Sequence, residues 1–181
     1  KVDTEYELAR NKVQEFINAK SRKEVVFTSG ATESLNYIAT GFFSNILEPG
    51  DEILITKSEH ASNVLPWFRL ARELNLEVNY IPLDNNYYVT VENVLKSITP
   101  KTKVIALAQV TNVIGDLRPI KKIAHIAHER GIFLVVDGAQ SVPHMKIDVQ
   151  DLDCDFLAFS AHKLCGPTGV GVLYGKEELL Q

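Results

Sequence analysis

The chain of 181 residues is long enough to bury one sizeable core, and its composition, 45% hydrophobic and 23% charged, excludes a disordered or fibrous protein. Its formal net charge of −4 provides no general basic field, so we expect neither nucleic acid nor a membrane as a partner. The two cysteines lack paired spacing, which argues against a disulfide framework and against a structural zinc site. We therefore expect a reducing, cytoplasmic location.

Segments typical of helices and strands alternate through the first half of the chain. Residues 1–19 carry apolar side chains at helical spacing on a charged background, unlike the apolar segment of a signal peptide. Strands are expected over 24–30, 51–57 and 77–83. A helix is expected after each of them, over 31–45, 64–75 and 90–98, the last with Thr90 as its cap.

The second half continues the alternation. Segment 103–110 is apolar almost throughout, as expected for a strand covered on both faces, and a helix ending near Gly131 follows it. Further strands are expected over 132–138, 155–162 and 169–175. The last two have no helix between them, so the final strand should be antiparallel. The fold class is therefore α/β, a single three-layer α/β/α domain with a mostly parallel seven-stranded sheet.

Non-hydrophobic residues follow five of the expected strands. In sheets of this kind, ligands bind beyond the carboxyl ends of the strands. The residues at these ends are Ser29, Gly30 and Thr32, then His60, Asn112, Asp137 and Gln140, and finally Ser160, His162 and Lys163. Their positions predict one shared pocket.

Lys163 and Asp137 together suit a pyridoxal phosphate site. The lysine amine can form a Schiff base with the cofactor aldehyde, and the carboxylate can keep the pyridine nitrogen protonated. Alone, each residue is weak evidence, because a strand-end aspartate is usually a cap or turn residue and a lone lysine is usually solvated.

The remaining polar residues can be given roles around the same cofactor. Gly30 and Thr32 precede or begin a helix whose amino end could hold the phosphate, although the same pattern is typical of an ordinary helix cap. His60 could stack on the ring and move protons, or could simply bond to the backbone at the start of a helix. The pair His125 and His128 lacks a third ligand, so no metal site is expected.

With these residues assembled, the chain resembles class V enzymes of the fold-type I pyridoxal phosphate group, and among them the SufS-type (group II) cysteine desulfurases and selenocysteine lyases. Five segments carry the resemblance in order: FTSGATESLN, EPGDEILITKSEHASNVLPW, TNVIG, VDGAQSVPH and DCDFLAFSAHKLCGPTGVGVLYGKEELL. They cover nearly the whole chain.

The resemblance implies catalytic roles for Lys163, which would carry the cofactor, and for His60. It implies the following contacts: Asp137 with the pyridine nitrogen, Gln140 with the phenolic oxygen, His60 with the ring, Thr32, Ser160 and His162 with the phosphate, Ala31 also with the cofactor, and Asn112 with substrate. The implied reaction converts L-cysteine to L-alanine and leaves an enzyme persulfide for iron–sulfur cluster or other sulfur assembly.

Members of this family have about four hundred residues, a length that corresponds to two domains. We therefore expect residues 1–181 to be a partial large domain that lacks the family's N-terminal segment and C-terminal small domain, and to be inactive alone. The expected partners of the full-length protein are L-cysteine or L-selenocysteine, a sulfur-acceptor protein and a second copy in a homodimer. Cys165 is not expected to be the nucleophile, because a fixed turn cannot swing onto substrate, and Cys154 is expected to be a packing residue.

Two alternatives remain open on the sequence alone. One is another class V enzyme on the same cofactor site, such as a selenocysteine lyase, a kynureninase-like hydrolase or an epimerase. The other is a cofactor-binding fragment without catalytic activity.

Overall fold

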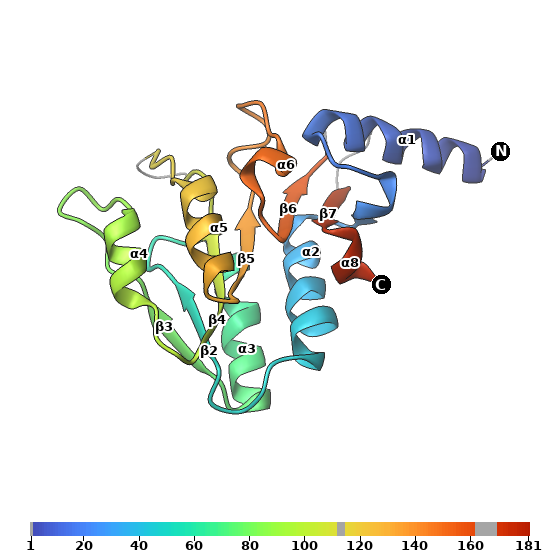
Figure 1. Ribbon diagram of the computed structural model, residues 1–181. Helices are drawn as coiled ribbons and strands as arrows, with labels where there is room; N and C mark the ends of the chain where they lie inside the picture. Colours follow the sequence, from blue (N-terminus) through green and yellow to red (C-terminus); the bar gives the residue numbers. More distant parts are fainter. Residues whose placement is uncertain (1, 112–114, 162–169) are drawn as a thin grey trace.

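The structure, a computed structural model, describes residues 2–111, 115–161 and 170–181 (Figure 1). Their central feature is one sheet with the strand order β1-β7-β6-β5-β4-β2-β3. The strands are β1 (Val25–Thr28), β2 (Glu52–Ile55), β3 (Glu77–Tyr80), β4 (Thr102–Ala108), β5 (Phe133–Asp137), β6 (Phe156–Ser160) and β7 (Gly171–Gly175). Strand β7 is antiparallel to both β1 and β6, and the pairs among β2 to β6 are parallel. The predicted sheet is thus confirmed, including the direction of its last strand.

Helices cover both faces of this sheet (Figure 1). They are α1 (Val2–Ile17), α2 (Ala31–Tyr37), α3 (Leu65–Leu74), α4 (Val91–Ser97), α5 (Ile120–Glu129), α6 (Val149–Leu152) and α8 (Glu177–Leu180). Side chains of α1, α4 and α5 pack in one apolar cluster, and those of α2 and α3 pack in another. Among the described residues, none of these helices is long and apolar enough to cross a bilayer.

The two clusters divide each central strand by alternation. In β2, Leu54 belongs to the α1, α4 and α5 side, whereas Ile53 and Ile55 belong to the α2 and α3 side. Successive side chains of a strand point to opposite faces, so a strand buried on both faces is apolar at every position. Burial of each such side chain stabilises the folded state by about 1.5–3 kcal/mol. This packing on both faces holds the ends of the strands in fixed positions.

The helix expected over 31–45 differs from the prediction. It is α-helical only to Tyr37, and it continues as the π-helical turn η2 (Ile38–Phe42) and a 3₁₀ turn (Phe43–Asn45). The wider π turn lets both consecutive rings, Phe42 and Phe43, contact Phe133 and Phe156 of the sheet. Packing against these rings therefore overrides the regular helical repeat.

Local signals set several other boundaries as expected. The Thr90 hydroxyl accepts a hydrogen bond from the backbone N–H of Asn93 at 3.1 Å and caps α4. Gly131 follows α5 with φ of +68°, the left-handed conformation that glycine adopts readily.

Candidate active site

A cavity of about 350 Å³ lies beyond the carboxyl ends of the parallel strands. It is lined by Ala31 and Thr32 of α2, by Ser58, Glu59, His60 and Ser62 after β2, by Ala108, Val110 and Thr111 at and after β4, and by Asp137, Ala139 and Gln140 at and after β5. Five of the residues singled out in the sequence therefore line the same cavity. They are Ala31, Thr32, His60, Asp137 and Gln140.

Asp137 is the last residue of β5 and is only 4% exposed. Its Oδ1 accepts a hydrogen bond from the backbone N–H of Ala139 at 3.0 Å. Burial is the main cause that raises the pKa of Asp137 above its ordinary value, and the charge of Glu59 acts in the same direction. The Ala139 bond and the charge of His60 lower the pKa but do not cancel this rise. The site therefore holds a carboxyl group whose charged form a bound cation would stabilise.

The start of α2 forms another wall of the cavity. The backbone N–H of Ser29 donates to Glu33 at 3.0 Å, and the Ser29 hydroxyl donates to the same carboxylate at 2.7 Å. Both bonds are donated by Ser29 to the Glu33 carboxylate, and together they fix the turn before the helix. Ala31 and Thr32 lie in the first turn, where backbone N–H groups have no acceptor within the helix and can bind an anion.

His60 lies at the start of a 3₁₀ turn, η4 (Ala61–Asn63). Its Nδ1 accepts a hydrogen bond from the backbone N–H of Ser62 at 3.1 Å, and the Ser62 hydroxyl lies 2.9 Å from the same nitrogen. The backbone bond that the sequence suggested as an alternative role for His60, at the start of a helical turn, is therefore present. The same bond fixes the ring at the cavity wall.

Behind the cavity wall is a buried ion cluster that sequence reasoning missed. The Arg118 side chain is fully buried, and its Nη1 lies 3.2 Å from the Glu59 carboxylate while its Nε lies 2.7 Å from that of Asp116. Glu59 also accepts hydrogen bonds from the backbone N–H of Ala108 at 2.5 Å and from the hydroxyl of Thr56. No local pattern signals a pairing between positions 59 and 118, because only the tertiary fold brings them together.

The other residues singled out in the sequence are placed only in part. Ser160 ends β6 beside β5, and its hydroxyl lies 3.4 Å from the carbonyl oxygen of Val170, but it is not among the residues lining the cavity. Asn112, His162, Lys163 and Cys165 lie outside the described residues. In the described ranges, no group of His, Cys, Asp and Glu side chains could hold a metal ion.

Cys154 is fully buried in the apolar cluster shared with α5. Burial raises the pKa of its thiol to about 12, with the charge of Asp155 adding to the effect. The thiol is therefore neutral and a poor nucleophile, which agrees with its expected role in packing.

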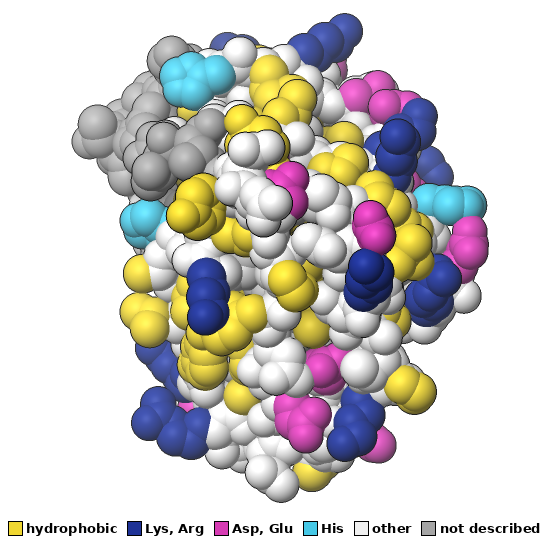
Figure 2. Space-filling model, turned by 90° about the vertical axis from the view of Figure 1, so that its left-hand side faces the viewer, with side chains coloured by type: hydrophobic (Ala, Val, Ile, Leu, Met, Phe, Trp, Pro, Cys, Tyr) yellow, Lys and Arg dark blue, Asp and Glu magenta, His cyan; other side chains and the backbone are white. Residues whose placement is uncertain are grey.

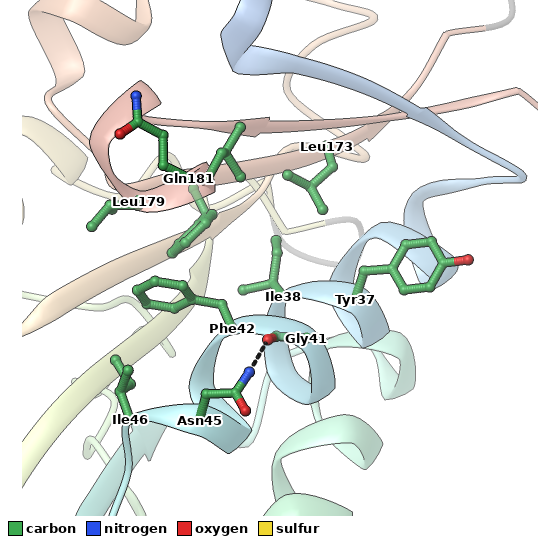
Figure 3. A pocket seen from close by; sticks show the side chains of 11 residues that line it. Tyr37, Ile38, Gly41, Phe42, Asn45, Ile46, Leu173, Leu179 and Gln181 are labelled. Carbon is green, nitrogen blue, oxygen red and sulfur yellow. Dashed lines mark hydrogen bonds between the residues drawn. The ribbon is translucent and has the colours of Figure 1, made fainter.

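A second cavity, of about 360 Å³, lies between α2, η2 and the end of the chain (Figure 3). Side chains such as Phe42, Leu173 and Leu179 line it, and Asn45 bonds to the backbone of Gly41 at its edge. It contains no acidic or basic side chain, so it offers no group for acid–base chemistry. On the face drawn in Figure 2, acidic and basic side chains are interspersed, without one large patch of either sign.

Comparison with known proteins identifies the family. The family model described as "Aminotransferase class-V" matches residues 1–181, and the chain belongs to this family. It is 49% identical to a probable cysteine desulfurase of Halalkalibacterium halodurans, over 97% of this chain and 43% of that protein. Among solved structures it is similar to the cysteine desulfurase CsdA of Escherichia coli, with a TM-score of 0.93 and 43% identity over 98% of this chain and 45% of the other.

Another similar structure is described as SspA in complex with cysteine; its TM-score is 0.82, with 32% identity over 93% of this chain and 48% of the other. The chain thus spans less than half the length of these proteins. Class V cysteine desulfurases depend on pyridoxal phosphate. The described cavity fits this group, because it offers the start of α2 to a phosphate and the buried Asp137 carboxyl to a protonated ring nitrogen.

Proposed function

We propose that the whole protein is a cysteine desulfurase and that this chain is part of its cofactor-binding large domain. The observation that carries the proposal is the convergence of Asp137, His60 and the start of α2 on one cavity. The relatives named cysteine desulfurase and the cysteine bound to SspA support L-cysteine as substrate. The family's N-terminal segment and C-terminal small domain would belong to the length that the chain does not span.

Asp137 would bind the protonated pyridine nitrogen of the cofactor. Bound pyridoxal phosphate supplies an electron sink for the bond changes at the amino acid. Asp137 serves this purpose only as a carboxylate, and a positive charge beside it would offset the effect of burial on its pKa. The Ala139 N–H already holds one carboxylate oxygen, so the side chain is oriented before the cofactor arrives.

The other cavity residues would orient the cofactor and move protons. Ala31 and Thr32 would bind the phosphate with their backbone N–H groups and the Thr32 hydroxyl. Gln140 would bond to the phenolic oxygen. His60 would cover the ring and, with Nδ1 occupied by Ser62, would exchange protons at Nε2.

For the remaining positions the proposal rests on the family motif. Lys163 would bind the cofactor aldehyde, Ser160 and His162 would complete the phosphate site, and Asn112 would contact substrate. In the overall reaction, the C–S bond of L-cysteine breaks, its sulfur forms an S–S bond with an enzyme thiol, and the carbon left behind takes a proton to give L-alanine. We place that thiol in the part of the protein that the chain does not span.

Within the desulfurases, the motifs favour a SufS-type enzyme. We propose that it acts as a homodimer in the cytoplasm and passes its sulfur to an acceptor protein for iron–sulfur cluster or related assembly.

The test is to incubate the full-length protein with L-cysteine and a reductant and to measure both products. Sulfide and alanine should appear in equal amounts, and both should vanish in Lys163→Ala together with the visible absorbance of bound cofactor. Lys121→Met, which alters an exposed lysine paired with Asp151, is the matched control and should retain activity. Alanine without sulfide, or turnover of kynurenine instead, would contradict the proposal.

A further inference from the structure

The buried cluster around Arg118 lies directly behind the cavity wall. Arg118 does not line the cavity itself, but two of its partners, Ser58 and Glu59, do. Its Nη2 donates to the Ser58 hydroxyl at 2.6 Å, and its Nη1 lies 3.2 Å from Glu59. His60 directly follows Glu59 in the chain, so Arg118 bonds to the segment that carries the His60 ring.

The same guanidinium holds two further segments. Its Nη1 donates to the carbonyl oxygen of Ala108 at the end of β4, at 2.9 Å. Its Nε donates to Asp116, whose carboxylate also accepts the backbone N–H of Val89 at 3.0 Å. One side chain thus joins the loop after β2, the end of β4 and the segment before α5.

Glu59 completes the connection from the opposite side. One carboxylate oxygen accepts the Ala108 N–H at 2.5 Å, and the other faces Arg118 and Thr56. Ala108 is therefore held through its N–H by Glu59 and through its carbonyl by Arg118. A planar guanidinium can make these bonds at fixed angles, whereas a lysine ammonium cannot reproduce them.

The charges show why the arrangement depends on Arg118. Glu59 and Asp116 place two carboxylates in the interior, and the Glu59 charge acts on Asp137 across the cavity. A buried carboxylate without a partner is strongly destabilised and moves toward solvent or takes up a proton. Arg118 supplies that partner and keeps the Glu59 side chain at the cavity wall.

We propose that Arg118 is a positioning residue, which acts through Ser58 and Glu59 to fix the His60 loop and the end of β4 around the cofactor. This inference rests on the proposed function, since it concerns the same cavity. It adds to that function a residue about which the family motifs quoted above say nothing.

The experiment compares full-length wild-type protein with Arg118→Lys, with the double variant Glu59→Gln/Arg118→Met and with the control Lys121→Met. The single variant Arg118→Met is measured beside them for its melting temperature. The readouts are the dissociation constant of pyridoxal phosphate, the circular dichroism of the bound cofactor and the melting temperature of the cofactor-free protein. Arg118→Lys keeps the charge but loses the bonding geometry of the guanidinium. The dissociation constant of pyridoxal phosphate should rise about tenfold, the lower end of the range of effects for residues that orient a ligand-binding group. The dichroism should change with it.

The double variant separates positioning from stability. It removes both charges of the Arg118–Glu59 pair, so no carboxylate is left facing a missing cation at Glu59, whereas Asp116 loses its cation in this variant and in Arg118→Met alike. We therefore expect a melting temperature closer to wild type than that of Arg118→Met alone. Cofactor affinity and dichroism should nevertheless remain altered, because Ser58 and Ala108 have lost their partner. The double variant also provides the test if Arg118→Lys does not fold.

Wild-type affinity and dichroism in either variant would overturn the role of Arg118 while leaving the proposed function intact. A wild-type protein that binds no pyridoxal phosphate would contradict the proposed function and the positioning role with it. Lys121→Met should match the wild type in all three readouts.

Discussion

Gly171 of β7 lies directly against the backbone of Gly30, the residue that precedes α2. A side-chain carbon at Gly171 would overlap the Cα, C and O atoms of Gly30, so only glycine allows this approach. The strand register explains the contact, because Gly171 pairs with Thr28 at the end of β1. The turn that leads into the proposed phosphate site is therefore held in place by a neighbouring strand.

The first prediction follows from this contact. Gly171→Ala should push the Gly30 turn outward, lowering the free energy of unfolding by about 1–3 kcal/mol and weakening pyridoxal phosphate binding. Gly41→Ala is the control, since a side-chain carbon there would meet nothing within 4 Å. Chemical denaturation and cofactor titration of both variants provide the measurement, and equal cofactor affinity in the two would contradict the prediction.

The second prediction concerns Asp137 in the cofactor-free protein. Its pKa is raised by burial, so the folded state binds its proton more tightly than the unfolded state. Stability from this group is then present below the unfolded pKa and is lost as the pH rises through the folded pKa. At pH 7, Asp137→Asn should therefore have a melting temperature a few degrees above that of wild type, since each kcal/mol of stability corresponds to about 2–4 °C. The difference should disappear toward about pH 4, near the pKa of an aspartate in the unfolded chain.

Asp148→Asn is the matched control for Asp137→Asn. Hydrogen bonds from Asn18 and from the Asp151 backbone lower the pKa of Asp148, so its contribution has the opposite sign and is lost as the pH falls. This substitution should not raise the melting temperature at pH 7. In cofactor titrations, Asp137→Asn should bind pyridoxal phosphate much more weakly than either wild type or Asp148→Asn.

The third prediction concerns Lys176, which lies 2.7 Å from Asp153 and 3.5 Å from Asp155. Burial alone would lower the pKa of Lys176, but the bond to Asp153 and the charge of Asp155 outweigh it and raise the pKa. Burial likewise acts to raise the pKa of Asp153, but the bond and charge of Lys176 together with His128 outweigh it and lower the pKa. Both shifts stabilise the folded protein at neutral pH.

Lys176→Met should therefore cost about 0.5–1 kcal/mol at pH 7, a value that allows for solvent screening of the half-exposed Asp153. The Asp153 contribution is lost as the pH falls through its folded pKa, and that of Lys176 only above its own raised pKa. The cost should thus shrink in acid. Urea denaturation at pH 7 and in acid measures it, and a cost that stayed constant with pH would count against this ion pair.

The fourth prediction is that Cys154 does not react while the protein is folded. Its buried thiol, with a pKa raised to about 12, should resist thiol reagents. Native wild type and native Cys154→Ala should give the same number of reactive thiols, and the wild type should show one more only in denaturant. Sulfide release should be unchanged by the substitution, and a large loss of activity would show that the thiol has a role beyond packing.

Periodicity and turn residues in the sequence predicted most of the fold. Apolar segments such as 103–110 indicated buried strands, and Thr90 and Gly131 marked helix ends, because these signals act over a few residues. The π turn at Ile38–Phe42 could not be predicted, since it depends on Phe133 and Phe156 far along the chain.

For the candidate site, sequence alone determined which residues could carry the chemistry, because their types and their positions after strands reflect local rules. It also carried the resemblance to the class V family, through five ordered segments. The tertiary structure decided how the cavity wall is held. Arg118 and Glu59 meet across 59 positions, and Gly171 meets Gly30 across 141, because strand order sets these contacts and no local pattern encodes it.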